Sequence, residues 1–162
     1  MVRFDRAHRR LSSLKWTGGL EAPNQFSDGY PVLVASEASL AALNERLAAA
    51  GQPAVGMERF RPNLVIAGVE AHDEDRLGAL DIAAAGAPVR LQLVKPCARC
   101  PIPDIDPATA QAGTAVGDAL RAYRQDPRLG GALTFGMNAI VRAGDGAVLR
   151  VGQAVSADWQ FD

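Results

Sequence analysis

The sequence predicts a mainly β protein, an antiparallel, closed or partly closed β-barrel with two or three short helices. Three observations carry this prediction: short apolar segments recur along the chain, glycine- and proline-rich turns separate them, and only two segments have helical spacing. With 162 residues, 48% of them hydrophobic and 22% charged, the chain is long enough for one domain with its own core. We expect a basic N-terminal arm at residues 1–25 and a single domain at residues 26–162.

The first half of the chain predicts a strand, a helix and a second strand. Residues 30–35 have the composition of a strand, and Ser36 is a residue type that caps helices. Leucines then follow at helical spacing towards Gly51: Leu40, Leu43 and Leu47. Residues 63–68 form an almost wholly apolar run, which is typical of a buried strand. The acidic stretch 72–76 predicts a solvated loop.

The second half predicts further strands and one short helix. Residues 80–82 and 89–94 are expected to be strands joined by a Gly-Ala-Pro turn, and Pro96 is expected to end the second one. The short helix presents one apolar face, formed by Val116, Leu120 and Tyr123. Residues 132–142 and 148–155 flank a glycine-rich turn, which predicts a β-hairpin.

Composition argues against several classes of function. The net charge is −1, so nothing in the charge balance indicates nucleic acid or a membrane surface as a partner. No apolar run has the length of a membrane span or the form of a signal peptide. Two cysteines do not make a disulfide framework, so we expect a protein of the reducing cytoplasm.

Both cysteines, Cys97 and Cys100, lie where an apolar strand runs into a proline-stiffened loop. The residue types leave four interpretations open: two small buried residues, a thioredoxin-like redox pair, half of a zinc site, or a single thiolate that binds a soft metal held otherwise by a cofactor. The prolines argue against the redox pair, because such pairs usually sit at a helix N-terminus. A closed zinc site needs four ligands, and only the isolated His8 and His72 remain as good candidates.

Two further segments, taken with the cysteine loop, carry a resemblance to a known family. They are Arg59-Phe60-Arg61-Pro62-Asn63-Leu64-Val65-Ile66 and Tyr30-Pro31-Val32-Leu33-Val34-Ala35-Ser36-Glu37-Ala38-Ser39-Leu40. Together with Cys97-Ala98-Arg99-Cys100 and the following Asp106-Pro107, they resemble the MOSC domain, the C-terminal domain of molybdenum cofactor sulfurase. The resemblance covers residues 26–155 and is greatest to the branch of the amidoxime-reducing component and its bacterial relatives. That branch normally carries a further N-terminal region, which we expect to be missing ahead of Met1.

The resemblance implies a β-barrel of MOSC type and a molybdenum cofactor of the molybdopterin type. It places Cys97 as the metal ligand and catalytic residue, because the cofactor's dithiolene leaves one soft position for the protein. The other residues that the resemblance brings to the cofactor are Ser36, Arg61, Asn63, Lys95, Arg99, Asp106 and Asn138. Arg59 and Arg61 are two residues apart, so in an extended segment both would lie on one face.

The implied activity is the reduction of N-hydroxylated compounds with electrons from a partner protein. The chain has no iron–sulfur or haem ligation pattern, so we expect a ferredoxin-like protein or a flavin reductase as the donor. The alternative is a cofactor-binding or sulfur-carrier module, with persulfide on Cys97, that works with a separate pyridoxal-phosphate-dependent desulfurase. A degenerate domain that binds neither group is the third possibility.

Overall fold

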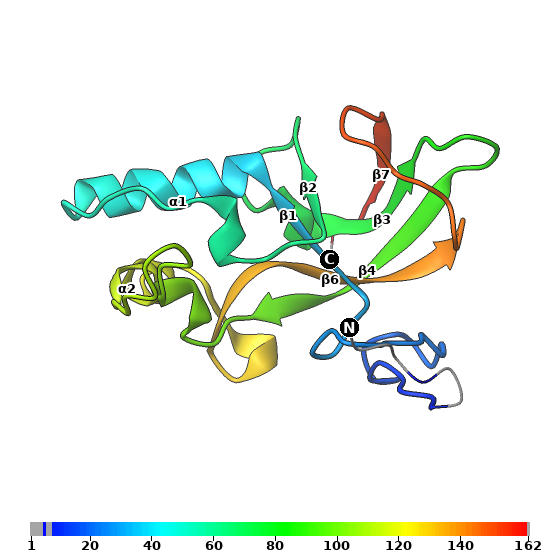
Figure 1. Ribbon diagram of the computed structural model, residues 1–162, viewed down its shortest axis with the longest axis horizontal. Coiled ribbons are helices and arrows are strands. Elements are labelled where there is room, and N and C mark those ends of the chain that lie inside the picture. The colour runs from blue at the N-terminus through cyan, green and yellow to red at the C-terminus, as the bar shows by residue number, and fades with distance from the viewer. Residues whose placement is uncertain (1–4, 6–7, 162) are drawn as a thin grey trace. The chain divides into compact units, whose positions relative to one another are not determined.

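The computed structural model describes residue 5 and residues 8–161. Its elements in chain order are β1 (Val32–Ser36), α1 (Glu37–Ala49), η1 (Met57–Arg59), β2 (Leu64–Ile66), η2 (Asp73–Arg76), β3 (Leu77–Ile82), β4 (Val89–Ala98), η3 (Ile102–Asp104), α2 (Ala115–Arg121), β5 (Gln125–Asp126), η4 (Pro127–Leu129), β6 (Ala132–Ala143) and β7 (Val155–Trp159), where η marks a 3₁₀ helix (Figure 1). The chain divides into two compact units. The first unit contains the described residues up to 32 with 76–95 and 138–161, and the second contains 33–75 and 96–137.

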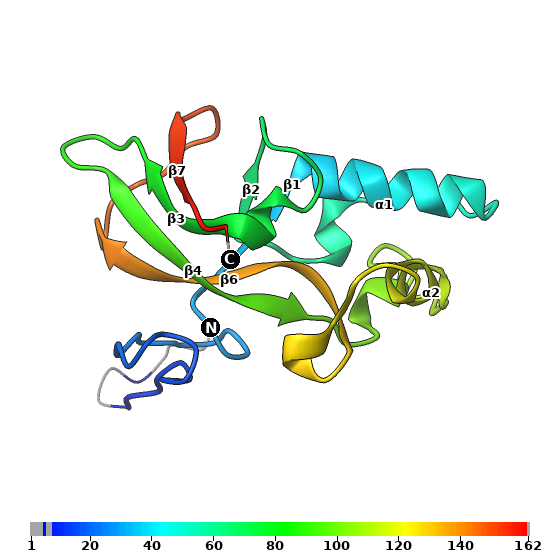
Figure 2. The ribbon, with the colours of Figure 1, turned by 180° about the vertical axis from the view of Figure 1, so that it is seen from behind.

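The second unit is built on a strand–helix–strand segment. Strand β1 pairs in parallel with β2, and α1 forms the connection between them. Helix α1 packs against α2, and both views of the ribbon show the two helices beside each other (Figures 1 and 2). The core of this unit is formed by Ala35, Leu43, Leu47, Phe60, Val116, Leu120 and Phe135. Burial of each leucine side chain contributes roughly 1.5–3 kcal/mol to folding.

The first unit contains the strands β3, β4 and β7 and the second part of β6, together with the N-terminal segment. Strand β3 pairs with β4 on one edge and with β7 on the other. Along β4 the buried positions alternate: Val89, Leu91 and Leu93. The N-terminal segment closes through a bridge between Leu11 and Pro23, and Ala22 packs with Tyr30 and Ile140 in a small apolar cluster.

The fold class is confirmed as mainly β, with two α-helices among the described residues, but the expectations of antiparallel pairing throughout and of a closed barrel are wrong. The β1–β2 pair is parallel, and the described strands follow the open path β2-β1-β6-β4-β3-β7, with β5 paired to β6 beside it. A strand–helix–strand connection can bring its second strand parallel to the first. The helix predicted between residues 36 and 51 was therefore an indication that the strands on either side of it pair in parallel. Strand composition alone does not reveal which strands are neighbours.

The predicted hairpin at residues 143–147 is also wrong. Residues 148–154 form no strand, and the last strand begins only at Val155. That strand, β7, pairs with β3 instead of β6. The valines that indicated a strand, Val148 and Val151, are exposed. A glycine-rich turn marks a reversal of the chain, but it does not choose the partner of the strand that follows.

Pro96 does not end its strand, because β4 continues to Ala98. Proline removes a backbone donor but fixes φ at a value that an extended chain can adopt. The consequence for the site is direct: Cys97 lies in the last part of a strand, not in a loop.

The acidic stretch 72–76 is not a solvated loop. It contains the 3₁₀ helix η2, in which Glu74 is fully buried. Within the N-terminal segment, Ser12, Thr17 and Asn24 are buried as well, so these residues of the expected arm are not solvated. Residues 1–4 and 6–7 of that arm lie outside the described residues. The domain boundary at residue 26 remains a prediction.

Candidate functional site

Two segments of the second unit, 59–63 and 97–106, are held together by a reciprocal pair of arginines. From the cysteine segment, Arg99 donates through Nη2 to the carbonyl oxygen of Phe60 at 3.0 Å. In return, Arg59 donates through Nη1 to the carbonyl of Pro103 and through Nη2 to Asp106 Oδ2, both at 3.2 Å. Each segment therefore supplies the cation that fixes the other.

The sulfur of Cys97 is half-buried and accepts a hydrogen bond from Arg99. Nη1 of Arg99 lies 3.1 Å from Cys97 Sγ, and the guanidinium carbon lies 5.5 Å from the centroid of the Phe60 ring. The backbone N–H of Arg99 donates to Leu133 O at 2.8 Å, which fixes this turn of the chain to β6. Cys100 is exposed, and no disulfide joins the two cysteines.

Asp106 is an anchor of its own loop. Its Oδ1 accepts from the backbone N–H of Ala108 at 2.8 Å and of Thr109 at 3.2 Å, while Oδ2 receives Arg59. These backbone N–H groups, together with the Arg59 charge, lower the pKa of the Asp106 carboxyl. A carboxylate whose two oxygens accept hydrogen bonds in this way holds the loop in place.

Arg61 and Asn63 lie at the exposed end of the same segment. Arg61 has φ of 55°, in the left-handed region, and forms no polar contact with the described residues. Asn63 is joined to β1, because its Oδ1 accepts from Leu33 N at 2.8 Å and its backbone N–H donates to Leu33 O at 2.9 Å. The expectation that Arg59 and Arg61 share one face of an extended segment is wrong, since Arg59 ends η1.

Ser36 is the N-cap of α1 and is fully buried. Its Oγ accepts from Ser39 N at 3.0 Å and lies 2.7 Å from Ser39 Oγ. Ser39 Oγ in turn contacts both carboxyl oxygens of Glu74 at 2.7 Å and accepts from His72 N at 2.8 Å. Ser36 therefore belongs to a buried hydrogen-bond network, and its hydroxyl is not presented to solvent.

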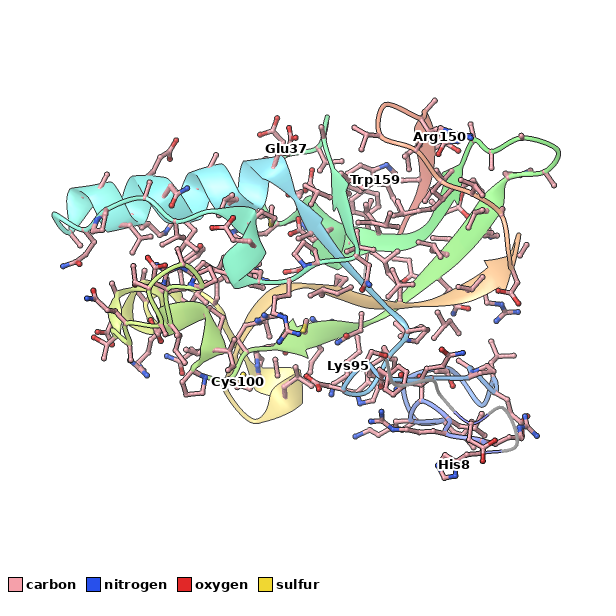
Figure 3. The ribbon with its side chains drawn as sticks, viewed as in Figure 1. His8, Glu37, Lys95, Cys100, Arg150 and Trp159 are labelled. Atoms are coloured by element: carbon pink, nitrogen blue, oxygen red, sulfur yellow. The ribbon has the colours of Figure 1, made fainter. Side chains whose placement is uncertain are left out.

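Lys95 and Asn138 belong to the first unit. The ammonium of Lys95 lies 5.6 Å from the ring centroid of Trp16 and 5.9 Å from that of Tyr30. Figure 3 shows Lys95 beside the N-terminal segment that carries these rings. Asn138 is half-buried on β6, and its side chain forms no polar contact with the described residues.

Sequence reasoning missed the buried polar groups around η2. Asp75 forms an ion pair of 2.7 Å with Arg124, and burial raises the pKa of Glu74 and of Asp75. The imidazole of His72 packs edge-on against Tyr123 and Phe135, and burial lowers its pKa to about 4. The signal was the stretch 72–76 itself, in which an isolated acidic cluster follows a strand.

The residues present fit a metal that brings most of its own ligands. Among the described residues, no three His, Cys, Asp or Glu side chains gather as a metal site. What the second unit does offer is one half-buried sulfur with a cationic donor beside it and an exposed arginine on the adjoining segment. In the described part of the chain, no helix has the length and apolar character needed to cross a membrane.

Comparison with known proteins agrees with the motifs in these two segments. Residues 21–156 match the model of the MOSC domain family. The chain is 39% identical over 104 residues to mitochondrial amidoxime-reducing component 1 of Homo sapiens, covering 63% of this chain and 28% of that protein. It is 32% identical over 127 residues to the human mitochondrial amidoxime reducing component 2, covering 76% and 36%. It is 42% identical over 84 residues to component 2 of Rattus norvegicus, covering 52% and 22%.

These matches thus span about a fifth to about a third of the relatives' own lengths. The family model, in contrast, covers both arginine-linked segments and most of the chain. The chain belongs to the MOSC domain family.

Proposed function

We propose that this chain is a molybdenum-cofactor-binding domain of a protein that reduces N-hydroxylated compounds such as amidoximes. The single observation that carries the proposal is the sulfur of Cys97, which is half-buried at a strand end with Arg99 donating to it. A lone protein thiolate is the donor that such a metal needs, because the cofactor brings its own sulfur ligands. The names of the similar proteins supply the substrate class.

The residues around the sulfur have distinct roles in this proposal. Cys97 ligates the metal, and Arg99 orients the sulfur while joining it to the 59–63 segment. Arg61 supplies an exposed guanidinium for an anionic group of the cofactor, and the side-chain N–H groups of Asn63 remain available to a planar heterocycle. When bound, the cofactor would supply two-electron redox chemistry at molybdenum.

Four of the predicted cofactor-binding residues have no assigned contact with the cofactor in this proposal. Ser36 and Asp106 stabilise the backbone of their own segments, because their side-chain oxygens accept hydrogen bonds from backbone N–H groups. Lys95 and Asn138 remain predicted contacts, and their polar groups form no hydrogen bond with the described residues. Electrons would come from a separate carrier, and a ferredoxin-like protein or a flavin reductase remains the expected class.

The test is molybdenum content per chain after expression in a host that makes the cofactor. We expect bound molybdenum and pterin fluorescence in the wild type and loss of both in Cys97→Ala. Cys100→Ala is the matched variant, since it removes the neighbouring thiol, which is exposed. Loss of metal in Cys100→Ala with retention in Cys97→Ala would transfer the ligand role to Cys100, and no metal in any protein would overturn cofactor binding.

The same preparations separate the proposal from the sulfur-carrier alternative. Persulfide on Cys97 without bound pterin, detected by mass spectrometry after incubation with a desulfurase and cysteine, would favour a carrier. The observation that favours the first proposal is the set of similar proteins, whose names describe amidoxime-reducing components.

A further inference from the structure

Strand β7 is an edge strand with an exposed apolar row. Among the described strands it pairs only with β3, so its other edge has no strand partner there. The side chains of Val155, Trp159 and Phe161 are 43%, 44% and 78% exposed. Trp159 and Phe161 stack with ring centroids 5.8 Å apart and planes within 2° of parallel. Figure 3 shows Trp159 on this last strand.

The apolar row of β7 extends the core face of its sheet. Val155 lies opposite Ile82, and Ala157 lies opposite Leu80, both of which are buried. Directly opposed residues in an antiparallel pair point to the same face. Val155, Ala157 and Trp159 therefore lie on the apolar face, where a further strand would continue the core.

Strand β7 is short, with five residues, and its pairing with β3 shifts register between Leu77 and Ala79, but it lacks the other devices that prevent strand addition. Exposed edges are commonly protected by lysine, proline or an inward-pointing charge. The only charged residue of β7 is Asp158, on the opposite face, and Arg90 of β4 forms an ion pair with it. The row of unpaired backbone groups thus stands beside an apolar surface, which is the combination that favours pairing with another strand.

We propose that this edge pairs with the same strand of a second copy of the chain, antiparallel and centred on Ala157. This register aligns all five residues of β7 with their counterparts. It places Val155 of each copy opposite Trp159 of the other, which gives two such pairs in the dimer. A β-branched residue and an aromatic residue are favourable cross-strand neighbours. It also places Asp158 opposite Ser156, so no like charges meet.

Other registers are worse for stated reasons. Centring the pair on Asp158 would set two carboxylates directly opposite each other, which is destabilising. A shift by one residue would put the apolar row of one copy beside the polar row of the other. The register centred on Ala157 is thus the one that aligns all five residues of β7 while it keeps the apolar rows together and the two carboxylates apart.

The first test is the association state of the full chain by sedimentation velocity across a hundredfold concentration range. We expect a reversible monomer–dimer equilibrium, because one edge strand makes a small interface. Trp159→Glu should weaken association by about tenfold or more, since it removes two apolar cross-strand pairs and adds two charges. Val151→Glu is the matched control: it makes the same charge change at an exposed apolar residue outside β7, and association should not change.

The second test reads the register and does not depend on the stability of a charged variant. Ala157→Cys should form a disulfide with itself across the dimer under mild oxidation, because opposed residues have Cα atoms about 4.5–5.5 Å apart. Ser156→Cys should cross-link to Asp158→Cys on another chain and not to itself. Peptide mapping assigns the bonds, since Cys97 and Cys100 remain present.

Three results would overturn the proposal: a monomer at every concentration, equal weakening by Val151→Glu and Trp159→Glu, or a dimer without the Ala157→Cys bond. None of these measurements uses the cofactor, so their outcome is independent of whether the proposed function is correct.

Discussion

Arg124 and Asp75 show how one residue can determine whether a buried carboxylate is tolerated. Their side chains are 11% and 21% exposed, and the two charged atoms lie 2.7 Å apart. Burial raises the pKa of Asp75, and the charge of Arg124 opposes that effect. The pair links η2 to the segment after α2. The ion pair therefore stabilises the packing of these two segments in the second unit.

We predict that Arg124→Met destabilises the protein by about 3–5 kcal/mol, because it leaves Asp75 buried without its cation. The measurement is the free energy of unfolding in urea. Arg121→Met is the control: Arg121 pairs with Asp118, but both side chains are about 60% exposed, so its loss should cost under about 1 kcal/mol. Equal losses in the two variants would contradict the bracing role of Arg124.

Helix α1 shows how a predicted binding residue also takes part in folding. Its N-cap hydroxyl, Ser36 Oγ, accepts from Ser39 N and joins the buried network of Glu74. The N-cap of helix α2 is Thr114, whose side chain makes no capping bond. Instead, Asp104 Oδ1 accepts from Gly117 N at 2.9 Å, so a residue of the cysteine loop stabilises the start of α2.

We predict that Ser36→Ala lowers the free energy of unfolding by about 1–2 kcal/mol, because the amide of Ser39 loses its acceptor. Thr114→Ala, at the matching position of α2, should change it by less than about 0.5 kcal/mol, since no cap bond is lost. Urea denaturation of both variants checks this prediction. An unchanged free energy of unfolding in Ser36→Ala would contradict the stabilising role of this cap.

At the scale of the whole molecule, stability in mild acid should depend on His72. Burial, together with the charges of Arg124 and Arg46, lowers the pKa of His72 to about 4. The unfolded chain takes up this proton near pH 6.5, while the folded chain does so only near pH 4. The contribution of neutral His72 to the free energy of unfolding is thus fully present above pH 6.5 and is lost progressively as the pH falls towards 4.

We predict that wild-type protein loses about 1 kcal/mol more stability between pH 7 and pH 5 than His72→Phe does, after allowance for partial solvent exposure of the ring. Phenylalanine keeps the aromatic contacts with Tyr123 and Phe135. Glu74 and Asp75 have raised pKa values and give the opposite slope, but they are present in both proteins. Urea unfolding at the two pH values measures the difference, and identical slopes would contradict it.

Residue patterns alone were sufficient for part of the local structure and for the family. The helix beginning after Ser36, the strands around residues 32–36 and 89–94, and the Cys97–Asp106 segment follow from capping chemistry, side-chain periodicity and motif order. These are properties of neighbours in the chain, and short stretches of sequence encode them.

Tertiary structure decided which strands are partners and which polar side chains are already occupied. It made β2 parallel to β1, joined β7 to β3, and used Asp106 and Ser36 for internal hydrogen bonds. Partner choice depends on contacts between residues far apart in the chain. A side chain's freedom to bind depends on what folding places around it, and no local pattern contains that information.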